Sequence, residues 1–182
     1  MNTSLLSSDD AGYNHLKSLL VDQKWGEADE ETYRLMQQIL DPNYQKSLPI
    51  SNDDMKIFPD RNLRILNNLW LESSGSRFGF TVQSKIWFTL PKPRIIQDKL
   101  PEQFKHIDYE YIRLRERFAA EVGWKQKGKS VPFRPGRKLG DRSLASIPRG
   151  YYPCKLLVHR SWSCQFIHWD VYFEKLESCF NS

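Results

Sequence analysis

The chain lacks the features that mark membrane-spanning and secreted proteins. Its 182 residues contain no run of roughly eighteen apolar side chains, which is the length that a helix needs to cross a bilayer. The opening segment, residues 1–20, has no charged start followed by an apolar stretch. A signal or transit peptide is therefore not predicted, and we expect a soluble protein that is not secreted.

Cysteine is scarce, and its spacing gives only a weak metal motif. The three cysteines include no C-x-x-C pair, so we expect reduced thiols rather than a disulfide framework. A C-x4-H-x4-C-x3-H pattern joins Cys154, His159, Cys164 and His168, and these side chains can ligate zinc. Because the paired cysteines that make zinc motifs specific are missing, we predict no metal site of the protein's own.

The common catalytic signatures are also absent. The sequence contains no P-loop, G-x-S-x-G, H-E-x-x-H or G-x-G-x-x-G motif. Its neighbouring carboxylates Asp53 and Asp54 fit a loop or the start of a helix better than an acid–base pair. Nothing in the sequence argues for catalysis, and we predict that the chain is not an enzyme.

What the chain does have is helical periodicity, whereas the alternation typical of strands is almost missing. The sequence therefore predicts an all-α fold. We expect a short N-terminal tail over residues 1–12 and one helical domain over residues 13–182. Helices are predicted near residues 13–20, 25–39, 59–70, 78–87, 107–121 and 164–180, the fourth ending at Pro91.

The positive charge is concentrated in one segment. Residues 124–160 hold ten Lys or Arg and one Asp, a net charge of +9, whereas residues 1–123 and 161–182 each carry a net charge of −2. With Gly123 included, this segment also has four prolines and five glycines, which predicts a long loop between the last helices. Long loops inside compact domains are usually functional or disordered, and the mixture of cations and aromatics favours function.

Several stretches occur in the order found in a known family. They are YNHLKSLLVDQKWGEADEETYRLM (13–36), FPDRNLRILNNLW (58–70), GSRFGFTVQSKIW (75–87), FAAEVGWK (118–125) and IPRGYYP (147–153). The chain resembles the tetrapyrrole-binding "genomes uncoupled" regulators of magnesium chelatase from cyanobacteria and plastids. The RFGFxVQxxIW block beside FPxxxLxxxxxLW is the most specific part of this resemblance.

The resemblance implies a single compact helical bundle whose concave face and late loop, here the basic loop 124–153, hold a porphyrin. It implies a non-catalytic protein that presents protoporphyrin IX or Mg-protoporphyrin IX and stimulates magnesium chelatase, with the porphyrin-binding large subunit as partner. The expected location is the cytoplasm of a cyanobacterium or the plastid stroma, and an anionic membrane surface is an alternative site of action.

The sequence departs from the family pattern in three places. Gly150-Tyr151-Tyr152-Pro153 replaces the usual G-H-L-P, the stretch between residues 88 and 122 is longer, and the extra N-terminal helical domain of cyanobacterial members is missing. These departures indicate a paralogue, and they bear more on chelatase stimulation than on porphyrin binding.

The expected binding residues combine aromatic rings with arginines. A porphyrin is a flat apolar disc with two carboxylates on one edge, and arginine pairs with carboxylates in a bidentate manner. The same mixture also suits single-stranded nucleic acid, which we consider the less favoured partner, or anionic lipid. The alternative function is therefore a protein- or nucleic-acid-binding module that has this fold but binds no porphyrin. The candidates are Phe58, Phe78, Phe80, Trp124 and Tyr151 for the disc, and Arg137, Arg142 and Arg149 for the carboxylates.

Two of these assignments leave alternatives open. Phe78 and Phe80 suit core packing as well as ligand contact, and we expect one ring to fix the turn while the other faces the ligand. Trp124 is either an anchor for the basic loop or an aromatic that closes over the disc, and we favour the second role. Trp87, inside a predicted helix, is expected in the core.

Overall fold

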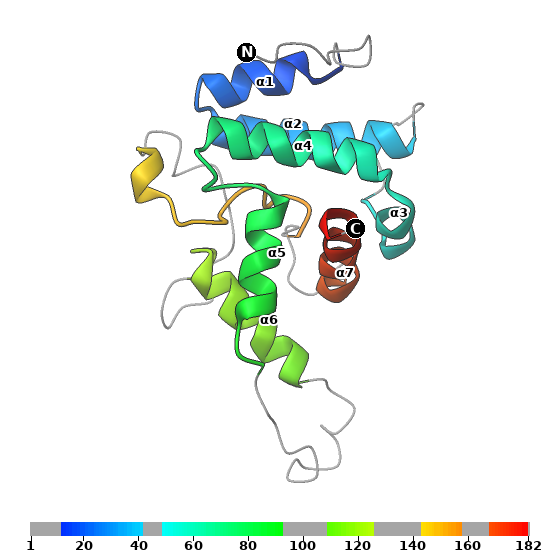
Figure 1. Ribbon diagram of the computed structural model, residues 1–182, viewed down its shortest axis with the longest axis vertical. Helices are drawn as coiled ribbons and strands as arrows, with labels where there is room; N and C mark the ends of the chain where they lie inside the picture. The colour runs from blue at the N-terminus through cyan, green and yellow to red at the C-terminus, as the bar shows by residue number, and fades with distance from the viewer. Residues whose placement is uncertain (1–11, 42–48, 93–108, 126–142, 158–167, 182) are drawn as a thin grey trace.

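The computed structural model describes residues 12–41, 49–92, 109–125, 143–157 and 168–181, and all of these ranges except 143–157 are mainly helical (Figure 1). No strand occurs in them, which confirms the expected all-α class. None of their helices is long and apolar enough to cross a membrane. The helices are α1 (Asn14–Val21), α2 (Trp25–Leu40), α3 (Asn52–Ile57), α4 (Asp60–Ser73), α5 (Phe80–Thr89), α6 (Tyr109–Glu121) and α7 (Trp169–Phe180), with a 3-10 turn at Leu144–Ser146.

Helices α1, α2 and α4 form one layer, seen at the top of Figure 1. Each helix has an apolar stripe at helical spacing, as the sequence predicts, and each stripe is buried. The buried side chains are Leu16, Leu19 and Leu20 of α1, Trp25, Ala28, Leu35 and Met36 of α2, and Leu63, Leu66 and Trp70 of α4.

Helices α5, α6 and α7 extend away from that layer, and α7 packs against α3, α4 and α5 (Figure 1). Helix α5 starts at Phe80 rather than at Phe78 because Gly79 precedes it with φ +129°, a conformation that side-chain-bearing residues rarely adopt. Helix α3 was not expected as a separate element. It begins with a reciprocal capping box, in which Ser51 Oγ accepts from Asp54 N and Asp54 Oδ2 accepts from Ser51 N.

Aromatic side chains dominate the core. In one cluster the Trp70 ring stacks between Trp25 and Tyr152, at centroid distances of 6.2 and 5.7 Å, and Phe78 meets all three rings edge-on. In a second cluster Trp87 stacks on Phe173 at 4.4 Å, which confirms that Trp87 is a core residue. The second cluster also contains Phe118, Trp124 and Trp169. Most of the aromatic content therefore stabilises the fold.

Candidate functional site

The two ends of the basic loop meet at one place on the fold. Trp124 Nε1, just after α6, donates a hydrogen bond of 2.8 Å to the carbonyl oxygen of Tyr151. Gly123, at φ +80°, lies so close to Pro148 that an added Cβ would come within 2.5 Å of its Cγ. Residues 123–124 and 148–151, which lie on either side of the basic segment in the sequence, are therefore in contact with each other.

The returning segment, residues 144–150, is fastened to the turn before α5 through Arg77. The Arg77 guanidinium donates from Nη2 to the carbonyl oxygen of Ile147 at 2.7 Å and to that of Ala145 at 3.4 Å. The Arg77 carbonyl oxygen in turn accepts from Gly150 N at 2.9 Å. One residue of the R-F-G-F motif thus positions the C-terminal end of the basic loop.

Gln83, buried on α5, holds the next part of this segment. Its Nε2 donates to the carbonyl oxygens of Gly150 at 3.0 Å and Pro153 at 2.6 Å, while its Oε1 accepts from the Tyr172 hydroxyl at 3.0 Å. The side chain has 0% exposure, so its polar atoms depend on these protein partners. Gln83 therefore links the G-Y-Y-P segment to α7.

Asp29 of α2 holds the residues that follow. Its carboxylate accepts from Cys154 N at 2.8 Å, from the Cys154 thiol at 2.8 Å and from Lys155 N at 3.1 Å. Burial raises the pKa of Asp29 above its ordinary value, and the hydrogen bonds from Cys154 and Lys155 oppose that rise. Burial, together with the adjacent carboxylate, also raises the pKa of the Cys154 thiol well above its ordinary value.

The predicted aromatic site residues lie inside the protein. Phe58, Phe78 and Phe80 have 0% exposure, Trp124 has 4% and Tyr151 has 7%. The expectation that either Phe78 or Phe80 faces outward is therefore wrong, because both rings fill the space between helices. Trp124 takes the anchoring position, not the outward one that we favoured.

These five rings do not form one platform. Phe78 and Tyr151 both contact Tyr152, at 5.5 and 4.8 Å between centroids, and Trp124 bonds to the Tyr151 carbonyl. Phe80 packs separately against Tyr172 of α7. Phe58 is the C-cap residue that follows α3.

The predicted cations are only partly described. Arg149 is exposed beside Gly150, whereas Arg137 and Arg142 lie outside the described residues. Of the weak zinc motif, Cys154 is buried against Asp29, while His159 and Cys164 also lie outside the described ranges. Within those ranges no group of three His, Cys, Asp or Glu side chains is placed to hold a metal.

A cluster between α6 and α7 was missed by the sequence reasoning. The His168 ring stacks on Tyr111 with centroids 4.3 Å apart and planes 9° apart. The Arg115 guanidinium carbon lies 5.4 Å from the Tyr111 ring centre and 4.9 Å from that of Trp169. Partial burial lowers the pKa of Arg115, yet an arginine remains charged at neutral pH. In the sequence these residues belong to two separate stretches, Y-E-Y-I-R-L-R on α6 and H-W at the start of α7. No rule of residue spacing predicts that the two stretches meet.

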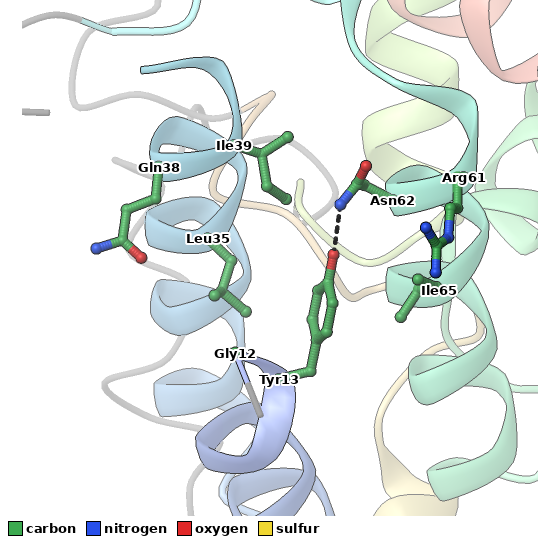
Figure 2. A pocket seen from close by; sticks show the side chains of 8 residues that line it. All are labelled: Gly12, Tyr13, Leu35, Gln38, Ile39, Arg61, Asn62 and Ile65. Carbon is green, nitrogen blue, oxygen red and sulfur yellow. Dashed lines mark hydrogen bonds between the residues drawn. The ribbon is translucent and has the colours of Figure 1, made fainter. Parts of the chain in front are cut away.

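A groove of about 390 Å³ lies between the start of α1, α2 and the start of α4. Figure 2 shows the Tyr13 hydroxyl directed at Asn62, whose Nδ2 donates to it at 2.8 Å. Its rim carries the exposed Gln38 and Arg61. The described residues that line the groove lie in residues 12–13, α2 and α4, so the groove is separate from the ends of the basic loop.

Together these observations define an all-helical domain with an aromatic core, in which the described residues that flank the basic segment contact each other. A family model described as GUN4-like matches residues 6–167, and the chain belongs to this family. This confirms the resemblance inferred from the sequence motifs.

Among curated proteins, the chain is 33% identical over 113 residues to "Tetrapyrrole-binding protein, chloroplastic" of Arabidopsis thaliana, covering 62% of this chain and 43% of that protein. It is 27% identical over 124 residues to "Uncharacterized protein ycf53" of Pyropia yezoensis, covering 68% of this chain and 50% of that protein. The chain thus spans about half the length of the curated relatives that it matches.

The fold resembles that of a solved structure, the ligand-free Arabidopsis thaliana GUN4. The TM-score is 0.57 and the identity 22%, over 97% of this chain and 96% of that one. At this identity the match supports the helical architecture, and the binding function has to be argued from the family and from the site.

Proposed function

We propose that this chain binds a tetrapyrrole, protoporphyrin IX or Mg-protoporphyrin IX, and regulates magnesium chelatase without catalysing a reaction itself. Family membership and the name of the Arabidopsis relative, a tetrapyrrole-binding protein, support a tetrapyrrole as the ligand. The chloroplastic relative also supports a plastid or cyanobacterial setting. The proposed binding domain is residues 13–182, and the proposed partner is the large subunit of the chelatase.

The hydrogen bond between Trp124 and Tyr151 is the observation that carries this proposal. It joins Trp124 to Tyr151, and between these two residues in the sequence lie residues 126–142, which hold six Lys or Arg against one Asp. A ligand with two carboxylates on an apolar disc needs cations beside an apolar surface. The half-buried Leu144 and Pro148 supply apolar surface near the anchored end, next to the exposed Arg149.

The residues at this site suit such a ligand. Arg77 and Lys125 add positive charge at the two ends of the basic loop, although Arg77 already donates to the backbone and Lys125 pairs with Glu116 at 3.0 Å. The carboxylates would therefore be held mainly by cations within residues 126–142. We propose Arg137 and Arg142 for this role, with Arg149 assisting, and we propose that Phe78, Trp124 and Tyr151, which are connected through Tyr152 and the Tyr151 carbonyl, lie beneath the disc. Phe58 and Phe80 pack elsewhere in the core and are not assigned to the disc.

The double change Arg137→Ala and Arg142→Ala tests this role. We expect it to weaken binding of protoporphyrin IX by about 1–3 kcal/mol, which is the usual loss for hydrogen bonds to charged groups. Affinity is measured by titrating the purified protein and following tryptophan quenching and the Soret band. Unchanged affinity would show that these two residues do not hold the carboxylates.

A matched control removes two other positive charges. Lys24→Ala with Lys56→Ala changes the net charge equally, and both lysines are exposed and in surface ion pairs of little energetic value. We expect this variant to bind porphyrin like the unmodified protein.

If the unmodified protein binds no porphyrin but binds single-stranded oligonucleotides with a steep salt dependence, the chain is a nucleic-acid-binding module instead. Co-sedimentation with anionic vesicles alone would indicate a membrane adaptor.

A further inference from the structure

Helix α5 exposes a phenylalanine in its last turn, although its opposite face is part of the core. Phe88 is 45% exposed, whereas the preceding Trp87 is 5% exposed and stacks on Phe173 at 4.4 Å. Val82 and Gln83 of the same helix are also buried. A single exposed apolar ring is common on protein surfaces, so its neighbours decide whether Phe88 has a role.

Three cations surround the end of this helix. Lys85 is exposed and lies three residues before Phe88, so both side chains are on the same face of α5. Lys92 is exposed just after the helix ends. Arg117 of α6 is exposed as well, and its Nη1 donates to the carbonyl oxygen of Pro91 at 2.7 Å. We call Lys85, Phe88, Lys92 and Arg117 the α5 end patch.

The charge of the two lysines is not neutralised by the part of the chain that the structure describes. Residues 73–92 include three Lys or Arg and no Asp or Glu. Neither Lys85 nor Lys92 pairs with a carboxylate of the described residues. By contrast, lysines in other described segments do form ion pairs, namely Lys24, Lys56, Lys125, Lys155 and Lys175. The α5 end patch therefore combines an exposed ring with uncompensated positive charge.

The backbone beneath the patch is held by hydrogen bonds. Thr89 Oγ1 donates to the carbonyl oxygen of Lys85 at 2.8 Å, and Leu90 N donates to that of Ile86 at 3.2 Å. Figure 1 shows this end of α5 pointing away from the layer of α1, α2 and α4. A surface that is already ordered loses less conformational entropy when it binds a partner.

The composition of the patch favours a protein partner over a bilayer or a nucleic acid. A helix that lies in a membrane surface needs a continuous apolar face, and the apolar face of α5 is occupied by the core. Single strands of nucleic acid stack successive bases on several rings, whereas the patch has one. An aromatic ring beside arginine is typical of the centre of protein–protein interfaces, and cations select a partner of opposite charge.

We propose that the α5 end patch binds an acidic segment of a partner protein. Phe88 packs against an apolar side chain of that segment, while Lys85, Lys92 and Arg117 face its carboxylates. This inference goes beyond the proposed function, because none of the residues proposed for porphyrin binding belongs to the patch. Either assignment can therefore fail without the other.

The test measures binding of a fluorescent peptide to the full chain by anisotropy. The peptide has about fifteen residues, with Glu and Leu at helical spacing. We expect saturable binding that weakens as the salt concentration rises. Phe88→Ser should weaken it roughly tenfold, as for an aromatic residue at the centre of an interface. Lys85→Glu with Lys92→Glu should weaken it at least roughly tenfold at low salt.

Matched controls change the same kinds of side chain elsewhere. Ile57→Ser removes an apolar side chain of α3 that is 74% exposed. Lys24→Glu with Lys56→Glu reverses two exposed charges on other elements. Both control variants should bind the peptide like the unmodified protein. A peptide with Gln in place of every Glu should not bind, and circular dichroism verifies that each variant retains its helices.

Two results would overturn the assignment. The first is an unmodified protein that does not bind the acidic peptide, and the second is that Phe88→Ser and the Lys85→Glu, Lys92→Glu variant bind it unchanged. If these variants instead lose binding to anionic vesicles or single-stranded oligonucleotides and the peptide does not bind, the patch serves a bilayer or a nucleic acid. Porphyrin titrations of the same variants should be unchanged, so a failure here leaves the proposed function standing. An unmodified protein that binds the peptide but no porphyrin would support the patch and reject the proposed function.

Discussion

Replacing Gln83 by leucine is expected to lower the free energy of unfolding by about 3–4 kcal/mol, because three buried polar groups lose their partner. The carbonyl oxygens of Gly150 and Pro153 would lack a donor, and the Tyr172 hydroxyl would lack its acceptor. The leucine is of similar size, so the loss reports the polar contacts more than a cavity. Urea unfolding followed by circular dichroism measures the effect.

A more conservative change separates hydrogen bonding from volume. Gln83→Glu retains the size of the side chain and an oxygen near Tyr172, but it places an acceptor or a negative charge against two carbonyl oxygens. We expect it to be as destabilising as leucine at neutral pH. Lys85→Ala, at an exposed position of the same helix, should change stability by less than about 0.5 kcal/mol. A leucine variant as stable as the unmodified protein would show that the Gln83 contacts contribute little.

Replacing Asp29 by alanine should cost about 3 kcal/mol, because the buried Cys154 amide and the partly buried Lys155 amide lose their acceptor. Asp29→Asn keeps one oxygen for these amides and removes a buried charge, so we expect a smaller loss, about 1 kcal/mol at neutral pH. Glu27→Gln, an exposed acid on the same helix, serves as the control. An alanine variant no less stable than the asparagine variant would contradict this role for the carboxylate oxygens.

The raised pKa of Asp29 adds a dependence on pH. The folded state binds the Asp29 proton more tightly than the unfolded state does, so this group's contribution to stability is greatest below its ordinary pKa of 3.8. That contribution is lost as the pH rises from there through the raised folded-state value. The stability of the unmodified protein relative to Asp29→Asn should therefore decrease over this interval. A difference that does not vary with pH would show that the two states bind the proton equally.

Much of the fold could be predicted from the sequence because its helices are amphipathic. The positions expected inside, such as Leu16, Leu63 and Phe118, are buried, since helical spacing places them on one face. Helix ends were less predictable. Phe78 has the spacing of a helical residue, but the backbone conformation of Gly79 delays the start of α5.

The site was only partly predictable. Sequence reasoning singled out Trp124 and Tyr151, which the structure joins by a hydrogen bond, but it could not tell which way either ring faces. The polar residues that secure the segment were missed. Asp29 and Cys154 are 125 positions apart, and Gln83 and Gly150 are 67 apart. In a helical pattern an isolated Asp or Gln resembles a solvated position, and only the packing of distant segments shows that it is buried.

The position of the Cys154 thiol gives the protein a built-in chemical reporter. Thiolates, not thiols, react with alkylating reagents and oxidants, and both the burial of Cys154 and its raised pKa suppress the thiolate in the folded chain. Its modification consequently requires the 150–155 segment to separate from α2. The rate at which a thiol reagent labels Cys154 therefore measures the local opening of the 150–155 segment, at the C-terminal end of the basic loop.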